Sequence, residues 1–139
     1  EGFVPENNVY EVELNFKFDR NDAPFGLDLC VGEGRRLPVR FDPLTDTFTV
    51  DRTNCADVEI EKFPMTKSEV IATDGENLHM RIFVDQSSVE IFLEEGHHSF
   101  SFLTYPSENQ CGLEFYSEGK GPRCSYKIWP LESIWKKID

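Results

Sequence analysis

Residues 78–105 hold three successive stretches in which apolar and polar side chains alternate, and two short polar turns separate them. Successive side chains of an extended strand point to opposite faces, so the alternate apolar residues from Leu78 to Val84 share one face. Residues 85–88 and 94–97 are short and polar, as hairpin turns are. This stretch therefore predicts an antiparallel sheet with one face buried and the other face open to water.

The same alternation recurs along most of the chain, and Gly or Pro interrupts it every 8–12 residues or so, which is about the spacing of strands in a sandwich or barrel. It is clearest over Tyr10–Phe18, where every second residue is apolar. Further strands are expected at residues 25–31, 39–41, 47–50, 58–60, 69–72, 113–115 and 124–128. The pattern predicts an all-β fold, a two-sheet antiparallel β-sandwich of jelly-roll or lectin-like type, as a single domain over residues 1–139. Apolar residues at helical spacing predict at most a short C-terminal helix over residues 131–138.

The first of the two turns lies in a stretch that resembles a known family signature. Residues 84–92 read Val-Asp-Gln-Ser-Ser-Val-Glu-Ile-Phe, and Glu-Gly at 95–96 and Tyr-Pro at 105–106 follow. This succession resembles the C-terminal β-sandwich domain of glycoside hydrolase family 32, which contains invertases, levanases and sucrose-6-phosphate hydrolases. Residues 48–52 and 111–116 resemble the flanking parts of the family pattern, so the resemblance covers most of the chain.

The resemblance implies an accessory domain of a larger enzyme. The family's catalytic carboxylates lie in an N-terminal propeller, within Trp-x-Asn-Asp-Pro-Asn-Gly, Arg-Asp-Pro and Glu-Cys. Residues 21–24 and 40–43 match these motifs only in part, and the chain has no Glu-Cys pair. The resemblance thus implies a non-catalytic domain that packs on and stabilises the absent propeller of a sucrose- or fructan-hydrolysing β-fructofuranosidase. A homodimer interface is a further role open to such a domain.

The charge of the chain excludes several classes of partner. The formal net charge is -12, from 26 acidic and 14 basic residues, and such a surface repels nucleic acids and anionic membranes. No apolar run approaches the length of a membrane span. Residues 1–10 lack the pattern of a signal peptide. We expect a bacterial cytoplasmic location, with secretion as the alternative.

The four cysteines are Cys30, Cys55, Cys111 and Cys124, and no two of them have the Cys-x-x-Cys spacing of a zinc site. Four reduced and mostly buried thiols are the expected state. Two disulfide bonds in a secreted protein are the alternative.

Other candidate sites have simpler structural explanations. Asp85 and Glu90 flank the first hairpin turn, whereas a retaining glycosidase needs two carboxyl groups about 5–5.5 Å apart. A turn residue and a solvent-facing strand residue explain these two carboxylates better than catalysis does. The acidic stretch 19–22 lacks calcium-loop spacing, and His97 and His98 are adjacent in a turn. We therefore expect no catalytic residue, metal or cofactor in this chain.

The aromatic residues suggest two binding surfaces. Phe83 and Phe92 fall on the strand face opposite the main apolar row, which should be polar in a two-layer sandwich. They form either a contact with another domain or a patch that a loop or the C-terminal tail covers. A second hypothesis is a carbohydrate-binding module for fructans, which would need an aromatic platform. The candidate platform residues are Trp129, Trp135, Tyr105 and Tyr116.

Overall fold

The computed structural model describes residues 9–53, 55, 66–85, 88–94, 96–104, 112–119 and 121–130. These residues form ten strands. They are β1 (Tyr10–Lys17), β2 (Phe25–Gly32), β3 (Arg35–Asp42), β4 (Thr47–Asp51), β5 (Thr66–Val70), β6 (Asn77–Val84), β7 (Ser88–Leu93), β8 (His98–Leu103), β9 (Gly112–Ser117) and β10 (Arg123–Pro130). The expected strand at 58–60 and the expected helix at 131–138 lie outside the described residues.

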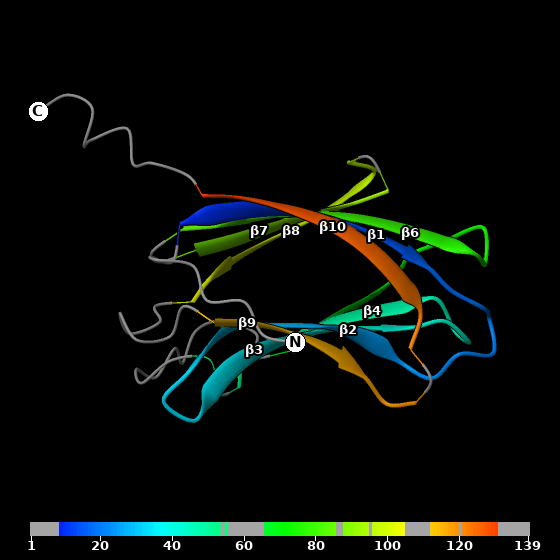
Figure 1. The fold of residues 1–139 in the computed structure, drawn as a ribbon, viewed down its shortest axis with the longest axis horizontal. Coiled ribbons are helices and arrows are strands. Elements are labelled where there is room, and N and C mark those ends of the chain that lie inside the picture. Colours follow the sequence, from blue (N-terminus) through cyan, green and yellow to red (C-terminus); the bar gives the residue numbers. More distant parts are fainter. Residues whose placement is uncertain are drawn as a thin grey trace, which may run out of the picture.

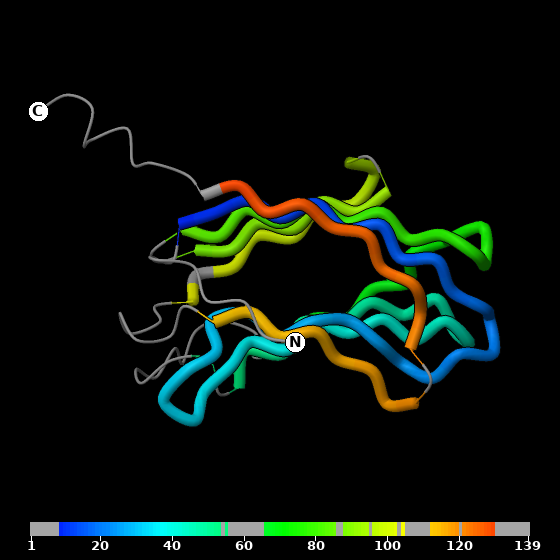
Figure 2. The backbone as a smooth tube through the Cα atoms, in the orientation of Figure 1, coloured from blue at the N-terminus to red at the C-terminus, as the bar shows by residue number. Residues whose placement is uncertain are grey.

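The strands form two antiparallel sheets that pack face to face (Figure 1). The first sheet has the order β10-β1-β6-β7-β8, and the second has the order β5-β4-β3-β2-β9. The hairpins predicted from residues 78–105 appear as β6, β7 and β8, which are neighbours in the first sheet. Figure 2 shows the two layers as separate sets of tubes. The prediction of an all-β sandwich is confirmed.

The core fills the space between the sheets with the apolar face of each strand. In β1 and β6 buried and partly exposed residues alternate, as the sequence predicts. Phe16 and Phe18 of the first layer contact Phe25 of the second at ring-centroid distances of 4.8 and 5.6 Å. Phe48 and Phe100 meet across the layers at 5.0 Å. Truncating such a buried ring costs about 3–5 kcal/mol, so these contacts hold the layers together.

Strand β2 departs from the expected alternation, because its first six residues are all buried. It lies between β3 and β9, and Arg36 and Arg40 of β3 form ion pairs with Asp28 on its outer face. The paired arginines cover the outer face, so Asp28 is only 3 % exposed. A β-bulge follows, with Cys30 at φ 52°, and it turns this side chain into the interior.

Strand β5 lies earlier than the sequence predicts, at Thr66–Val70 instead of 69–72. All five of its residues are exposed, so it lacks the apolar alternation that would reveal it. Ile71, just after the strand, is fully buried, and its N–H donates to the carbonyl of Asp46 at 2.7 Å. The apolar residue in this region therefore caps the core instead of extending the strand.

Three cysteines lie among the described residues, and all three are thiols. Cys30 and Cys55 are buried, and Cys124 is half-buried on β10. Cys111 is outside the described residues. Within the described part of the chain, we find no helix with the length and apolar character needed to cross a membrane.

Candidate binding surface

The outer face of the first sheet carries the most unusual set of side chains. Strand register places Glu11 opposite Phe83, and Phe83 opposite Glu90. Two residues further along these strands, Glu13 lies opposite Arg81, and Arg81 lies opposite Phe92. These residues occupy the positions between the buried ones, so they all point away from the core.

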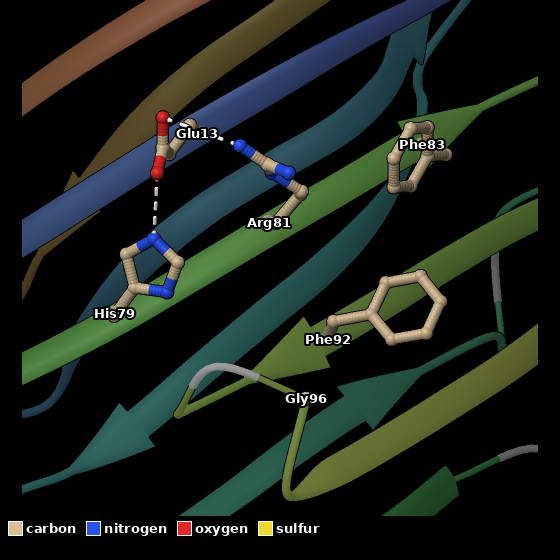
Figure 3. Close-up of a pocket in the computed structure, with 6 residues that line it drawn as sticks. All are labelled: Glu13, His79, Arg81, Phe83, Phe92 and Gly96. Atoms are coloured by element: carbon tan, nitrogen blue, oxygen red, sulfur yellow. Dashed lines mark hydrogen bonds and ion pairs between the residues drawn. The ribbon is translucent and has the colours of Figure 1, made fainter.

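Phe83 and Phe92 contact each other edge to face, with ring centroids 5.8 Å apart and ring planes at 85°. They are diagonal neighbours on β6 and β7, and both are half-buried. The sequence prediction that they lie together on the face opposite the apolar row is confirmed. They border a hollow of about 490 Å³, which we call the Phe83–Phe92 hollow (Figure 3). The other lining residues are Glu13, His79, Arg81 and Gly96.

Ion pairs form a polar rim beside the two rings. The His79 Nε2 atom lies 2.8 Å from a Glu13 carboxylate oxygen. Arg81 reaches Glu11 at 3.1 Å and Glu13 at 3.5 Å. Figure 3 shows the Glu13 carboxylate between the His79 ring and the Arg81 guanidinium group. The hydrogen bond with His79 is the main reason that the pKa of Glu13 is lowered; burial opposes it, and the charge of Arg81 adds to it.

The turn after β7 fixes the position of His79. The His79 N–H donates to a Glu94 carboxylate oxygen at 3.1 Å, and the Glu94 N–H donates to the His79 carbonyl at 3.0 Å. The rim therefore presents donors and acceptors in set positions next to an apolar ring pair. Such a combination suits the central part of a protein interface or the recognition of a polar ligand. The sequence signal for the rim is the i, i+2 spacing of His79 and Arg81, which places both side chains on the same strand face as Phe83.

The two candidate platform residues in the described part of the chain, Trp129 and Tyr116, lie on different surfaces. Trp129 lies on the outer face of the first sheet, opposite Glu11, and is 39 % exposed. Tyr116 lies on the outer face of the second sheet, where the Arg40 guanidinium carbon sits 3.5 Å from its ring centroid. One face of the Tyr116 ring is therefore already covered. Tyr105 and Trp135 lie outside the described residues.

On the outer face of the second sheet, charged side chains form ion pairs with one another. Asp28 accepts a hydrogen bond from Arg36 at 2.6 Å, and it forms an ion pair with Arg40 at 2.8 Å. Arg36 also reaches Glu114 at 3.2 Å. Together with the stacking of Arg40 on Tyr116, these contacts form a closed polar network.

The remaining sequence candidates occupy turns and strand surfaces. The Asp85 N–H donates to the Ser88 carbonyl at 2.8 Å, and Glu90 points outward beside Phe83. In the 19–22 turn, a carboxylate oxygen of Asp19 accepts from the Asn21 N–H at 2.9 Å. His98 approaches Glu69 at 3.7 Å. Within the described ranges no group of three or more His, Cys, Asp or Glu side chains is arranged to hold a metal ion.

Comparison with known proteins identifies relatives whose similarity covers nearly the whole of this chain. The chain is 30% identical over 135 residues to a levanase of Bacillus sp. (strain L7), which covers 94% of this chain and 15% of that protein. It is 30% identical over 132 residues to a levanase of Bacillus subtilis (strain 168), covering 92% of this chain and 20% of that protein. It therefore spans a fifth or less of the length of these two relatives.

Solved structures show the same architecture. The exo-inulinase of Aspergillus awamori superposes with a TM-score of 0.87 at 23% identity, over 97% of this chain and 27% of that one. The sucrose-6-phosphate hydrolase of Lactobacillus gasseri gives a TM-score of 0.75 at 20% identity, over 96% of this chain and 28% of that one. The profile of the family described as glycosyl hydrolases family 32, C terminal, matches residues 2–130. The resemblance seen in the sequence is confirmed, and the chain belongs to the C-terminal domain of glycosyl hydrolase family 32.

Proposed function

We propose that this chain is the non-catalytic accessory domain of a β-fructofuranosidase, and that it packs on the N-terminal catalytic domain of the same protein through the Phe83–Phe92 hollow. The observation that carries the proposal is the edge-to-face ring pair, half-exposed on a sheet face that should be polar. The much greater length of the relatives supports a neighbouring domain as the occupant.

The composition of the hollow specifies what the catalytic domain should contribute. An apolar side chain would fill the space beside Phe83 and Phe92, since burying one such side chain is worth about 1.5–3 kcal/mol. Polar groups around it would meet the rim of Glu11, Glu13 and Arg81, whose charges already neutralise one another in part. A stable contact of this kind buries at least about 1,000 Å² in total.

The test is co-purification of this domain with the catalytic domain produced as a separate polypeptide. The double substitution Phe83→Ser with Phe92→Ser should abolish co-elution, because it removes both rings from the interface. Leu44→Ser is the matched control, since Leu44 is 69 % exposed in the β3–β4 turn, away from the hollow. Co-elution of the double variant at wild-type level would refute the role of the ring pair.

A fructan chain is the second candidate occupant of this face. The observation that favours it is Trp129, 39 % exposed and aligned across the sheet with Glu11 and Phe83. An aromatic ring beside a carboxylate is a common way to bind sugars. Titration of inulin, levan and sucrose against tryptophan fluorescence tests this function. A change lost in Trp129→Ala supports sugar binding, and no change at millimolar sugar opposes it.

The substrate and location of the parent protein are also part of the proposal. We infer hydrolysis of sucrose, sucrose-6-phosphate or fructan by the parent, and a bacterial cytoplasmic location. Immunoblotting of the source organism should reveal a native protein several times larger than 16.1 kDa. A native band at that mass would leave the proposal without its catalytic domain.

A further inference from the structure

Two cations lie directly opposite each other at one end of the outer face of the first sheet. Lys17, the last residue of β1, is opposite Arg123, the first residue of β10. Both side chains are exposed, whereas Phe16 and Cys124 beside them pack against the core, so the two cations point away from it. Like charges in directly opposed positions destabilise a sheet. In a chain with a net charge of -12, this pair of cations needs a physical explanation.

Neutral hydrogen-bonding side chains surround the two cations. Asn15 lies opposite Ser125, and Asn77 lies opposite Lys17, so these three share the outer face with the cations. They border a hollow of about 280 Å³, which we call the Lys17–Arg123 hollow. Its lining residues are Asn15, Phe16, Lys17, Asn77, Arg123, Cys124 and Ser125. Within the described ranges the side chains of Asn15 and Ser125 make no hydrogen bond, so their amide and hydroxyl groups are available to a ligand.

The carboxylates in the adjoining turns do not neutralise the two cations. Asp74 accepts hydrogen bonds from the Asn77 N–H at 2.7 Å and from the Asn77 side-chain amide at 3.0 Å. The carboxylates of the 19–22 turn accept from backbone N–H groups of the same turn. Among the described residues, no ion pair contains Lys17 or Arg123.

The remaining cations of this sheet face already have carboxylates beside them. Arg81 forms ion pairs with Glu11 and Glu13, and Lys127 lies opposite Glu13 in the register of β1 with β10. These carboxylates occupy the part of the face nearer the end of β10, away from Lys17 at the end of β1. The positive charge at the Lys17–Arg123 hollow is therefore unbalanced locally, and it attracts an anion.

We propose that the Lys17–Arg123 hollow binds a phosphate group, either free or at the end of a small hydroxylated molecule. A phosphate monoester carries a charge of about -1.5 to -2 at pH 7, so one phosphate group offsets both cations. The Arg123 guanidinium group can donate two parallel N–H bonds to it, and Lys17 adds a compact charge. Asn15 and Ser125 can donate to the remaining oxygens. This binding role goes beyond the accessory role proposed above and does not depend on it.

A second hollow, of about 310 Å³, shares Asn15 and Asn77 with the first. Its other polar lining residues are His79, Glu94 and His97. Amide, imidazole and carboxylate groups provide both donors and acceptors, which suit the hydroxyl groups of a polyol. A hydroxylated phosphate monoester can place its hydroxyl groups in this second hollow, whereas free phosphate cannot. The two sources of the phosphate group therefore differ in the residues that they contact.

The test is NMR titration of the backbone amides of the full chain with inorganic phosphate. Sodium chloride keeps the ionic strength constant, because salt screens contacts between exposed charges. We expect saturable shifts at residues 15–17 and 123–125, with a Kd of about 1–10 mM. Lys17→Gln and Arg123→Gln should each weaken binding about five-fold or more. Lys127→Gln is the matched control and should change the Kd less than about two-fold, since it removes an equal charge outside the hollow.

Lys17→Glu separates loss of binding from loss of folding. It replaces a like-charge pair with an opposite-charge pair across β1 and β10, so it should raise the urea midpoint while it abolishes phosphate binding. Wild-type amides that do not shift up to about 50 mM phosphate would overturn the inference. Equal weakening by Lys17→Gln and Lys127→Gln would also overturn it, because the effect would then come from net charge alone.

Titration with glycerol 1-phosphate identifies the source of the phosphate group. Tighter binding than that of inorganic phosphate, with additional shifts at His79 and His97, assigns a hydroxylated monoester as the ligand. Equal or weaker binding assigns free phosphate. Glycerol alone should cause no shift, and shifts equal to those with glycerol 1-phosphate would overturn the role of the cations. The double Phe83→Ser and Phe92→Ser variant should still bind phosphate, since neither ring lines this hollow. Failure of the phosphate site is therefore distinguishable from failure of the proposed domain contact.

Discussion

Gly26 is the position where a single methyl group should damage this fold most. It lies on β2 between β3 and β9, at φ +156°, which residues with side chains rarely adopt. A Cβ there would overlap the carbonyl oxygen of Val39 and would lie 3.0 Å from its carbonyl carbon. The atoms in the way belong to the backbone of β3, which is paired with β2. They therefore cannot move aside as the end of a flexible side chain could.

The magnitude of the Gly26→Ala effect follows from two contributions. The strained φ costs about 1–3 kcal/mol. Displacing β3 weakens two or three ladder hydrogen bonds, each with a net value of about 0.5–1.5 kcal/mol. We expect a total of about 2–7 kcal/mol, against a domain stability of about 5–15 kcal/mol. The variant should therefore lose about half of its free energy of unfolding.

Urea unfolding measures this effect, and Gly34→Ala is the matched control. Gly34 also has a positive φ, +73°, but a Cβ there meets nothing within 4 Å. The control should therefore lose only the conformational cost of about 1–2 kcal/mol. With a urea slope of about 1–3 kcal/mol/M, Gly26→Ala should lower the midpoint by about 0.7 M or more. Equal losses in the two variants would refute the steric argument.

Three further predictions concern individual charged groups and thiols. Asp28→Ala should lower the free energy of unfolding by about 2–4 kcal/mol in urea, less than for fully buried ion pairs because its arginine partners are partly exposed; a loss below about 1 kcal/mol would contradict this reasoning. The pKa of Glu13 is lowered in the fold, so its stabilising contact with His79 is present above the ordinary carboxyl pKa and is lost as pH falls through the lowered value. In the His79→Phe variant the pKa of Glu13, measured by NMR titration of the carboxyl group, should be higher than in the wild type. An unchanged pKa would refute the role of His79. Burial raises the pKa of Cys124 to about 11, so alkylation followed by mass spectrometry should be slow at pH 8 and fast in urea, and equal rates would contradict that pKa.

The sequence predicts the faces of individual strands well, because a period of two is a local signal. The alternation in Tyr10–Phe18 and residues 78–93 correctly separates core residues from outer ones, including Phe83 and Phe92. The prediction fails for β5, since Thr66–Val70 is an exposed edge strand without a buried face to reveal it.

The alternation of apolar and polar residues does not predict which strands distant in sequence lie side by side. Glu114 lies opposite Asp28 only through the register of β9 with β2. The stacking of Arg40 on Tyr116 depends on the same register together with that of β3. Trp129 and Tyr116 therefore looked equivalent as sugar platforms, although they lie on opposite outer faces of the sandwich.

The charged side chains on the outer face of the second sheet are more completely covered by their partners than the rings on the outer face of the first sheet are, and this difference supports the first sheet as the site of the proposed domain contact. On the second sheet, Asp28 is 3 % exposed because two arginines pair with it, and Arg40 covers Tyr116. Opening that face to a partner would first require breaking these contacts. On the first sheet the polar groups are also paired, but Phe83 and Phe92 keep half-exposed rings beside a hollow. A partner gains apolar burial there without disrupting existing ion pairs, so the first sheet is the face on which association is most favourable.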